Sequence, residues 1–389
     1  MMRTKPSASD LTKRRFELAS RRLGTKNPAE AIGGLLDRSF HLPAGDPRYG
    51  NNLLTPGKFP LEHSYSEVAG NAFRLDMQPL GPEATPHARQ QEASREMRRL
   101  TQQNYGAQAL NWFDQRSERW RAGMSHGDSR FGAWFGMATD SHGLQECKVY
   151  YEMRENDIDA LPPTLKHAAR ISMQMMPSLV PIFTSIACGR NRGAQRVYFF
   201  NQGDLRLLDL EPLLNQLGIG KQLPSLLAAA GVIFGGRFIL PEGSVIIGLR
   251  DTSKGIEMKL DVLVAGMPDP PQQMYQLLNM VLAERPSSQM GLQRWVQAMT
   301  PDHADNPGEI GVISIRVLQD TPARCSLYLR PSGYDQMGRL SDGPGSHNGA
   351  YQHHGHMHNG QGYQHNGSSY RQNGHSSIYA PAPQDPYRV

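Results

Sequence analysis

Residues 60–79 read PLEHSYSEVAGNAFRLDMQP, and the second half of this stretch alternates apolar and polar side chains. Alternation with a period of two is typical of a β-strand with one buried face. Arg74 and Asp76 stand on the polar face, and Glu62 lies upstream in PLEHS. Thr, Ser or Lys would serve a solvated face equally well. The question is therefore whether such charged pairs recur in the rest of the chain.

Four more strand pairs follow, each around a polar turn and each separated from the next by helical sequence. The pairs lie within residues 130–153, 181–200, 243–266 and 310–334. Helical patterns lie between them, within residues 85–121, 164–176, 210–218, 223–235, 270–284 and 290–299. The longest of these patterns is expected to break near Gly106. This order predicts an α+β fold of repeated αββα units, although the strands are spaced too unequally for a sequence repeat.

The composition argues against a membrane or secreted protein. The 389 residues are 38% hydrophobic and 20% charged, and no apolar run approaches the 18 residues of a membrane span. The basic N-terminus lacks the apolar core of a secretory signal, and three widely separated cysteines suit a reducing compartment. We therefore expect a cytoplasmic protein. The net charge of +5 permits an anionic ligand without demanding one.

The two ends of the chain differ from the middle. Residues 1–58 contain one helical pattern, at 9–23, followed by linking sequence rich in Gly, Pro and Asn. Residues 336–389 consist largely of Gly, His, Asn, Gln and Ser, which cannot bury a core. We predict an N-terminal helix and linker (1–58), a barrel (59–335) and a disordered tail (336–389). The irregularly spaced histidines of the tail favour a solvated extension over a metal site.

The second strand of every pair carries at least one Lys or Arg on its polar face. Three of the five strands also place a Tyr two residues from the cation. The polar-face residues are Arg74, Asp76 and Gln78; Lys148, Tyr150 and Glu152; Arg196 and Tyr198; Glu257, Lys259 and Asp261; and Arg324, Ser326, Tyr328 and Arg330. A solvated sheet face would explain any one of these strands, whereas five together indicate a shared polar interior.

The predicted architecture is an antiparallel ten-stranded β-barrel with helices outside and a polar, cationic lumen. This arrangement inverts the α/β barrel, whose interior is packed with branched apolar residues, and closure removes exposed strand edges. Arg, Lys and Tyr converging in such a lumen suit a diphosphate better than a carboxylate. A nucleic-acid duplex would not fit, and the chain has neither a GxxxxGK[ST] motif nor a strand-associated GxGxxG motif.

The strands resemble those of the ABBA aromatic prenyltransferases, most closely the indole prenyltransferases of the dimethylallyltryptophan synthase type. PLEHS resembles that family's P-[IV]-E-x-S strand, and NAFRLDMQP resembles its VR-x-x-x-EP strand. KVYYEM is similar to its K-x-Y-x-x-P strand, and SLYLRP to its Y-x-[KR]-P strand. The likeness covers residues 58–334 and depends on the order of these short motifs on successive hairpins.

The resemblance implies transfer of a prenyl group from dimethylallyl, geranyl or farnesyl diphosphate to an electron-rich ring, usually an indole. Cationic side chains would stabilise the departing diphosphate, and Tyr rings would shield the allylic carbocation. We expect no cofactor to be required, since the chain has no DDxxD motif to hold Mg²⁺. Mg²⁺ could still stimulate the reaction. The acceptor stays open among free tryptophan, an indole alkaloid, a cyclic dipeptide, a ribosomal peptide and a phenol. We expect a monomer or homodimer without membrane or nucleic-acid partners.

The resemblance also assigns roles by position. Glu62 matches the general base that binds the indole N–H. The expected diphosphate-binding residues are Arg74, Lys148, Arg196, Lys259 and Arg330, and the expected cation-shielding residues are Tyr150, Tyr198 and Tyr328.

Three positions depart from the family pattern. Ala194 stands where a further cation is usual, and Lys259-x-Asp261 replaces Gln-x-Tyr. Asp261 weakens the aromatic shield on its side and suits a polar or cationic acceptor. Asp76 has no counterpart in the pattern, and it either pairs with Arg74 or holds Mg²⁺.

Two other functions stay open. A triphosphate tunnel hydrolase is also a barrel lined with Arg, Lys and Glu, but its ExExK strand is approached here only by Glu257-Met258-Lys259. A non-catalytic barrel would bind a lipid diphosphate or a peptide. The Glu62→Gln variant distinguishes an enzyme from such a binding protein. In an enzyme it should abolish turnover and leave the affinity for the diphosphate unchanged.

Overall fold

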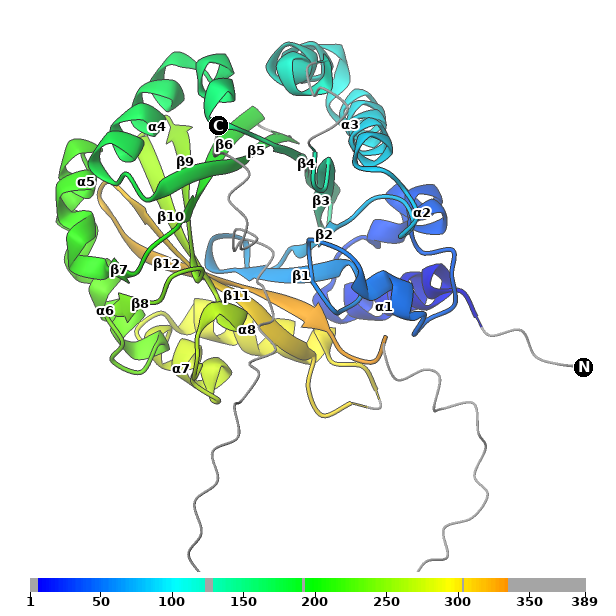
Figure 1. Ribbon diagram of the computed structural model, residues 1–389. Helices are drawn as coiled ribbons and strands as arrows, with labels where there is room; N and C mark the ends of the chain where they lie inside the picture. The colour runs from blue at the N-terminus through cyan, green and yellow to red at the C-terminus, as the bar shows by residue number, and fades with distance from the viewer. Residues whose placement is uncertain (1–5, 123–128, 191–192, 303, 335–389) are drawn as a thin grey trace, which may run out of the picture.

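Ten strands form five antiparallel hairpins that close into one barrel (Figure 1), as predicted. The computed structural model describes residues 6–122, 129–190, 193–302 and 304–334. Around the barrel the strand order is β1-β12-β11-β10-β9-β6-β5-β4-β3-β2. The barrel strands are β1 (Leu61–Ser66), β2 (Phe73–Met77), β3 (Ala133–Asp140), β4 (Gly143–Glu152), β5 (Leu179–Gly189), β6 (Gly193–Asn201), β9 (Val245–Thr252), β10 (Gly255–Leu263), β11 (Gly308–Leu318) and β12 (Thr321–Pro331). Two short strands, β7 (Leu205–Arg206) and β8 (Ile239–Leu240), pair outside it.

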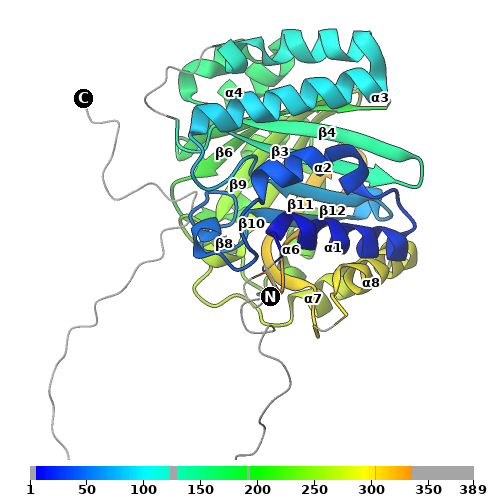
Figure 2. The ribbon, with the colours of Figure 1, turned by 90° about the vertical axis from the view of Figure 1, so that its right-hand side faces the viewer.

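The α-helices lie around the outside of the barrel, as Figures 1 and 2 show. They are α1 (Ala8–Leu23), α2 (Pro28–Ser39), α3 (Pro86–Ala122), α4 (Pro163–Met175), α5 (Glu211–Gln216), α6 (Leu223–Ile233), α7 (Met274–Val281) and α8 (Pro286–Met299). The apolar faces of the strands point toward them. Leu75, Val149 and Val197, for example, are buried in one core with Met97 and Leu226 of the helices. The main hydrophobic core therefore lies between the barrel and the surrounding helices, and the opposite faces of the strands point into the lumen.

Helix α3 breaks at Gly106, as predicted. Gly106 has φ 83° and ψ −177°, a conformation that Gly adopts more readily than any other residue. The second half of the helix returns alongside the first (Figure 2), and Arg98 pairs with Asp114 across the two halves at 3.1 Å.

The segment after α1 is more structured than predicted. Residues 24–58 were expected to be linking sequence, but residues 28–39 form helix α2, which begins with Asn27 accepting a hydrogen bond from the Ala29 N–H at 3.0 Å. Two adjacent glycines, Gly33 and Gly34, hide this helix in the sequence because Gly is a poor helix former. Tertiary packing overrides that preference.

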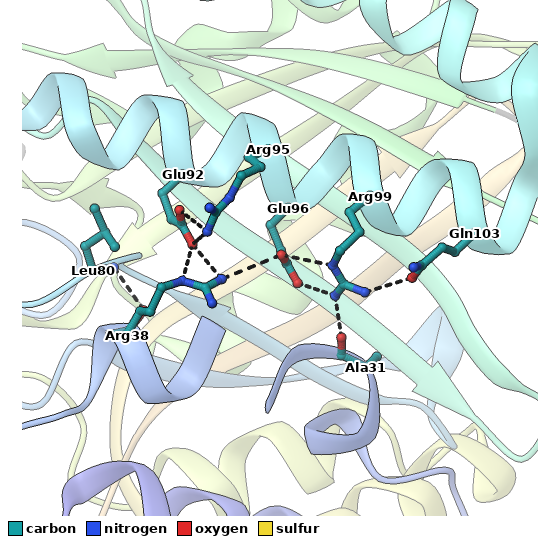
Figure 3. Close-up of polar contacts among 9 residues, drawn as sticks. Ala31, Arg38, Leu80, Glu92, Arg95, Glu96, Arg99 and Gln103 are labelled. Atoms are coloured by element: carbon teal, nitrogen blue, oxygen red, sulfur yellow. Dashed lines mark hydrogen bonds and ion pairs between the residues drawn. The ribbon is translucent and has the colours of Figure 1, made fainter. Parts of the chain in front are cut away.

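An ion-pair network joins α2 to α3 (Figure 3). Glu92 and Glu96 of α3 are buried, with 8% and 2% of their surface exposed. Arg38 of α2 donates to Glu92 at 2.8 Å, and Arg99 both pairs with Glu96 and donates to the Ala31 carbonyl at 2.5 Å. The buried carboxylates thus fix the position of α2.

The two ends of the described chain meet on one side of the barrel. Tyr334 stacks on Phe59 with ring centroids 4.1 Å apart, and its hydroxyl donates to Thr12 of α1 at 3.1 Å. Phe16 of α1 belongs to the same core as the strands. The tail predicted at 336–389 lies outside the described residues. Within those residues, no helix is both long and apolar enough to cross a membrane.

Candidate active site

The polar faces of the strands line the lumen, as the parity of the strands predicted. One small cavity of about 50 Å³ remains there, which is room for one or two water molecules. Its walls hold five of the predicted site residues, namely Glu62, Tyr150, Tyr198, Lys259 and Tyr328. Three lumen cations, Lys148, Arg196 and Lys259, pair with carboxylates there.

The cations and tyrosines contact each other inside the barrel. The Lys148 ammonium lies 4.9 Å from the ring centre of Tyr150, and the Arg196 guanidinium lies 5.9 Å from that of Tyr198. Tyr328 faces a different cation from the one expected by its strand: Lys259 lies 4.6 Å from its ring and donates to its hydroxyl at 2.9 Å.

Asp76, which the family pattern left unexplained, pairs with Lys148. Its Oδ1 lies 3.1 Å from Lys148 Nζ and accepts a hydrogen bond from the Tyr150 hydroxyl at 3.2 Å. The expected alternative partner, Arg74, instead lies 3.5 Å from Glu146. Room for the pair comes from Gly136, where a Cβ atom would fall 2.1 Å from Asp76 Oδ1.

Asp261 forms a second such pair. Its carboxylate lies 2.8 Å from Lys259 Nζ and also accepts a hydrogen bond from Ser314. Burial opposes the charge of Lys259, but Asp261 and Tyr328 outweigh it and raise the pKa of the ammonium. Both lumen lysines therefore carry a carboxylate partner.

The hairpin-turn end of the lumen is rich in arginine. Glu257 pairs there with Arg196 and, at 2.6 Å, with Arg250. Burial opposes ionisation of Glu257, yet Arg196, Arg316 and Arg250 together lower its pKa to about 2. The pKa of Glu146 is lowered as well, because Arg74 and other cations outweigh its burial.

Glu62 lies toward the opposite end, where β1 begins. It is 6% exposed and stands beside Asp76 in the register of β1 and β2. Burial raises the pKa of Glu62 to about 8, an effect that Arg330 opposes and that Asp76 reinforces. A carboxyl group with this pKa is a stronger base than an ordinary one once it is ionised.

An aromatic cluster occupies the same end of the lumen. Trp134 and Phe183 pack with ring centres 5.5 Å apart, and Phe183 lies 4.4 Å from Tyr198. Leu54, from the segment before β1, also lines the cavity. The lumen thus has an arginine-rich turn end and an aromatic end that contains Glu62.

Sequence reasoning found Glu62 on β1 but missed the residues that the first strands of the other four hairpins contribute. They are Trp134 of β3, Phe183 of β5, Arg250 of β9 and Arg316 of β11. The same division by parity finds both arginines. Arg250 stands on the face opposite Ile247 and Leu249, and Arg316 on the face opposite Ile315 and Val317. Phe183 is harder to find because β5 shifts register between Pro181 and Phe183.

Arg330 lies at the rim. It lines a groove outside the barrel mouth and faces Glu309 at 3.6 Å. Among the described residues, no group of three or more His, Cys, Asp and Glu side chains gathers in a way that could hold a metal ion.

No protein-family model and no curated protein matches this sequence. Solved structures do match the fold. The 6-dimethylallyltryptophan synthase from Micromonospora olivasterospora, solved in complex with DMASPP and Trp, aligns with 86% of this chain and 99% of its own at a TM-score of 0.68 and 15% identity. The chain has the barrel fold of a prenyltransferase.

Two further structures agree with this fold. The 5-dimethylallyltryptophan synthase from Streptomyces coelicolor aligns with 85% of this chain and 99% of its own, with a TM-score of 0.64 and 15% identity. AnaPT from Neosartorya fischeri aligns with 73% of this chain and 82% of its own, with a TM-score of 0.54 and 13% identity. The resemblance seen in the sequence is thus confirmed at the level of the fold.

Proposed function

We propose that this protein is an aromatic prenyltransferase that moves a prenyl group from a prenyl diphosphate to an electron-rich aromatic acceptor of the indole type. The observation that carries the proposal is the division of the closed lumen into an arginine-rich end and an aromatic end that holds Glu62. Prenyl transfer separates charge in the same way, because the leaving group is an anion and the reacting carbon becomes a cation.

The proposed roles combine the family resemblance with the positions of these groups in the lumen. The C–O bond of the allylic diphosphate breaks and the diphosphate keeps the electron pair, which Arg74, Lys148, Arg196 and Lys259 stabilise. Tyr150, Tyr198 and Tyr328 present π faces to the allylic cation and keep water away. The ring carbon then forms the new C–C bond. The ionised Glu62 accepts the N–H hydrogen bond of the acceptor and takes up the proton that the ring loses.

The diphosphate must compete with carboxylates already present in the lumen. Lys148 holds Asp76, and Lys259 holds Asp261. A bound diphosphate would replace these carboxylates on the two lysines, and the cavity would have to widen beyond its present 50 Å³.

The proposal is tested by incubating the full chain with dimethylallyl, geranyl and farnesyl diphosphates against a panel of indoles and phenols. Mass spectrometry should detect a prenylated acceptor, and parallel reactions with EDTA and with Mg²⁺ measure any dependence on metal. Glu62→Gln should lose turnover while still binding the prenyl diphosphate. No product with any acceptor, together with no diphosphate binding, would overturn the proposal.

A further inference from the structure

A larger hollow opens at the hairpin-turn end of the lumen. It is about 590 Å³ in volume and is bounded by the β9–β10 turn, the β11–β12 turn, the segment after β1 and the start of α8. We call it the turn-end cleft. Its charged lining consists of Arg250, Lys254, Arg285, Arg316 and Arg324 against Glu67 and Glu257.

The cleft has more positive charge than its carboxylates can neutralise. Glu67 is fully engaged: it pairs with Arg285 at 2.6 Å and Arg324 at 2.9 Å, and it accepts the Cys325 N–H at 3.0 Å. Glu257 is shared between Arg250 and Arg196.

Arg316 acts on Glu257 only at longer range, where its charge helps to lower the pKa of that carboxylate. In the described part of the chain, Arg316 forms no ion pair, and its Nε atom is buried without a hydrogen-bond partner. A buried donor without an acceptor costs about 1–3 kcal/mol, more when it is charged, unless a ligand or solvent satisfies it. Burial and the neighbouring Arg196 also lower the pKa of Arg250 to about 10, which shows how closely the cations crowd.

Neutral donors complete the lining. Ser287 and Ser288 belong to the first turn of α8, and both line the cleft. The positive end of the helix dipole favours an anion, although the Ser288 N–H already donates to the Arg285 carbonyl at 2.9 Å and the Ser288 hydroxyl to Glu67 at 3.3 Å. Arginine forks and hydroxyl donors around one hollow are the usual partners of phosphate oxygens.

The cleft is continuous with the cations of the lumen. Arg316 stands opposite Lys259 in the register of β10 and β11, and Arg250 reaches the lumen residue Arg196 through Glu257. The cations of the cleft and those of the lumen therefore adjoin one another on β6, β9, β10 and β11.

We propose that the turn-end cleft is a second anion-binding site, which takes a phosphate-class ligand with at least two negative charges. Inorganic diphosphate occupies it on the way between the lumen and solvent. Binding in the cleft depends only on the contacts above, whereas the passage of diphosphate rests on the proposed prenyl transfer.

Titration calorimetry of the full chain with inorganic diphosphate tests the site without requiring turnover. The wild type should show two binding events. Arg316→Gln should lose the cleft event, and Lys148→Ala should lose the lumen event. Arg206→Gln is the matched control, because it removes one arginine from an exposed pair with Asp209 outside the barrel, and it should keep both events.

Lys254→Gln tests the cleft independently in case the Arg316 variant misfolds. Lys254 is exposed on the β9–β10 turn, so its substitution should leave the fold intact. It should weaken the cleft event about twofold to fivefold, the effect of one peripheral charge. If Arg316→Gln and Lys254→Gln both bind diphosphate with wild-type affinity and stoichiometry, the proposed anion site in the cleft is wrong. A single wild-type event that Arg316→Gln abolishes and Lys148→Ala retains would support the cleft while contradicting the lumen diphosphate site.

Discussion

Glu62 combines deep burial with a position beside two lumen aspartates. Burial destabilises its charged form and is the main cause of its raised pKa; Arg330 and Lys259 relieve part of that effect, while Asp76 and Asp261 add to it. With a pKa of about 8, the side chain is mostly protonated at pH 7. Its activity as a base is therefore gained as the pH rises.

The pH dependence of turnover should follow this ionisation. We expect kcat/KM to rise about tenfold between pH 7 and pH 9, since the ionised fraction of a group with a pKa of about 8 increases by that factor. Glu62→Gln should lose turnover at every pH in that range. Steady-state rates at several pH values provide the measurement, and a flat wild-type profile would contradict the role of Glu62.

Stability should change in the opposite sense. The folded protein holds a proton on Glu62 up to about pH 8, whereas the unfolded chain releases it near 4.5, so this group costs stability increasingly as the pH rises from 4.5 to 8. Glu62→Gln should unfold at higher urea concentration than wild type at pH 8. That result would also show that the inactive variant is folded.

Gly136 tests the pairing of Lys148 with Asp76. An added methyl group would lie 2.1 Å from Asp76 Oδ1 and 2.4 Å from Lys148 Cε, so Gly136→Ala must separate the pair. The displaced Lys148 would lose its charged hydrogen bond to the diphosphate, which is worth about 1.5–3 kcal/mol, so dimethylallyl diphosphate should bind at least about tenfold more weakly. Calorimetry measures this change.

Gly203→Ala is the control, because a Cβ atom there meets no other atom within 4 Å. It should bind dimethylallyl diphosphate as the wild type does. Equal affinities in the Gly136 and Gly203 variants would show that Lys148, in its present position, does not bind the diphosphate.

Among the elements, the strands were predictable and α2 was not. A two-residue alternation marks a strand whatever surrounds it, so the polar faces of β2, β4, β6, β10 and β12 could be identified without a structure. Helix α2 contains two glycines and owes its stability to buried partners on α3. Partners such as Arg38 and Glu92 are 54 residues apart, and no local pattern reveals that they meet.

The α2–α3 network makes an element-scale prediction. Arg99→Met removes the close partner of buried Glu96 and the bond to the Ala31 carbonyl. We expect the free energy of unfolding to fall by about 2–3 kcal/mol, somewhat less than the loss of a fully buried partner because Arg99 is partly exposed. Urea denaturation measures the loss.

Arg95→Met offers the comparison on the same helix. Arg95 also pairs with a buried glutamate, but its side chain is 61% exposed and Glu92 keeps Arg38 as a partner. The change should cost less than about 1 kcal/mol. Similar losses in both variants would mean that the buried network does not hold α2 in place.

At the scale of the whole molecule, α1 joins the barrel through an aromatic contact that depends on pH. His63 of β1 packs edge-on against Phe16 of α1 and Phe73 of β2, with ring centres 5.7 and 5.4 Å apart. Burial, and to a lesser degree Arg15, lowers the pKa of His63 to about 3. The folded protein therefore keeps this imidazole neutral where the unfolded chain protonates it.

Stability should fall on acidification for this reason. Between pH 6.5 and pH 3 the unfolded state binds the additional proton, so His63 costs about 2 kcal/mol when the pH is lowered from 7 to 5. His63→Phe should lose less stability over that interval than the wild type. Urea midpoints at the two pH values provide the comparison, and identical losses would contradict the assignment.

The barrel as a whole was predictable from the five hairpins, but the contents of the lumen were not. Parity shows which residues face inward, yet it does not show which of them meet across the barrel. Lys259 and Tyr328, for instance, belong to strands separated by β11. Such contacts depend on closure and tilt of the sheet, which no single strand specifies.

The carboxylates that fill the lumen have a consequence for how the protein exchanges its ligands. Asp76, Asp261 and Glu257 pair with Lys148, Lys259 and Arg196, so the fold tolerates these cations without a bound anion. An incoming diphosphate then replaces one set of negative oxygens with another, and much of its attraction is spent on that replacement. Moderate affinity and rapid departure of the product are the expected result. Carboxylates that compete with the ligand inside the lumen thus favour repeated turnover over tight ligand binding.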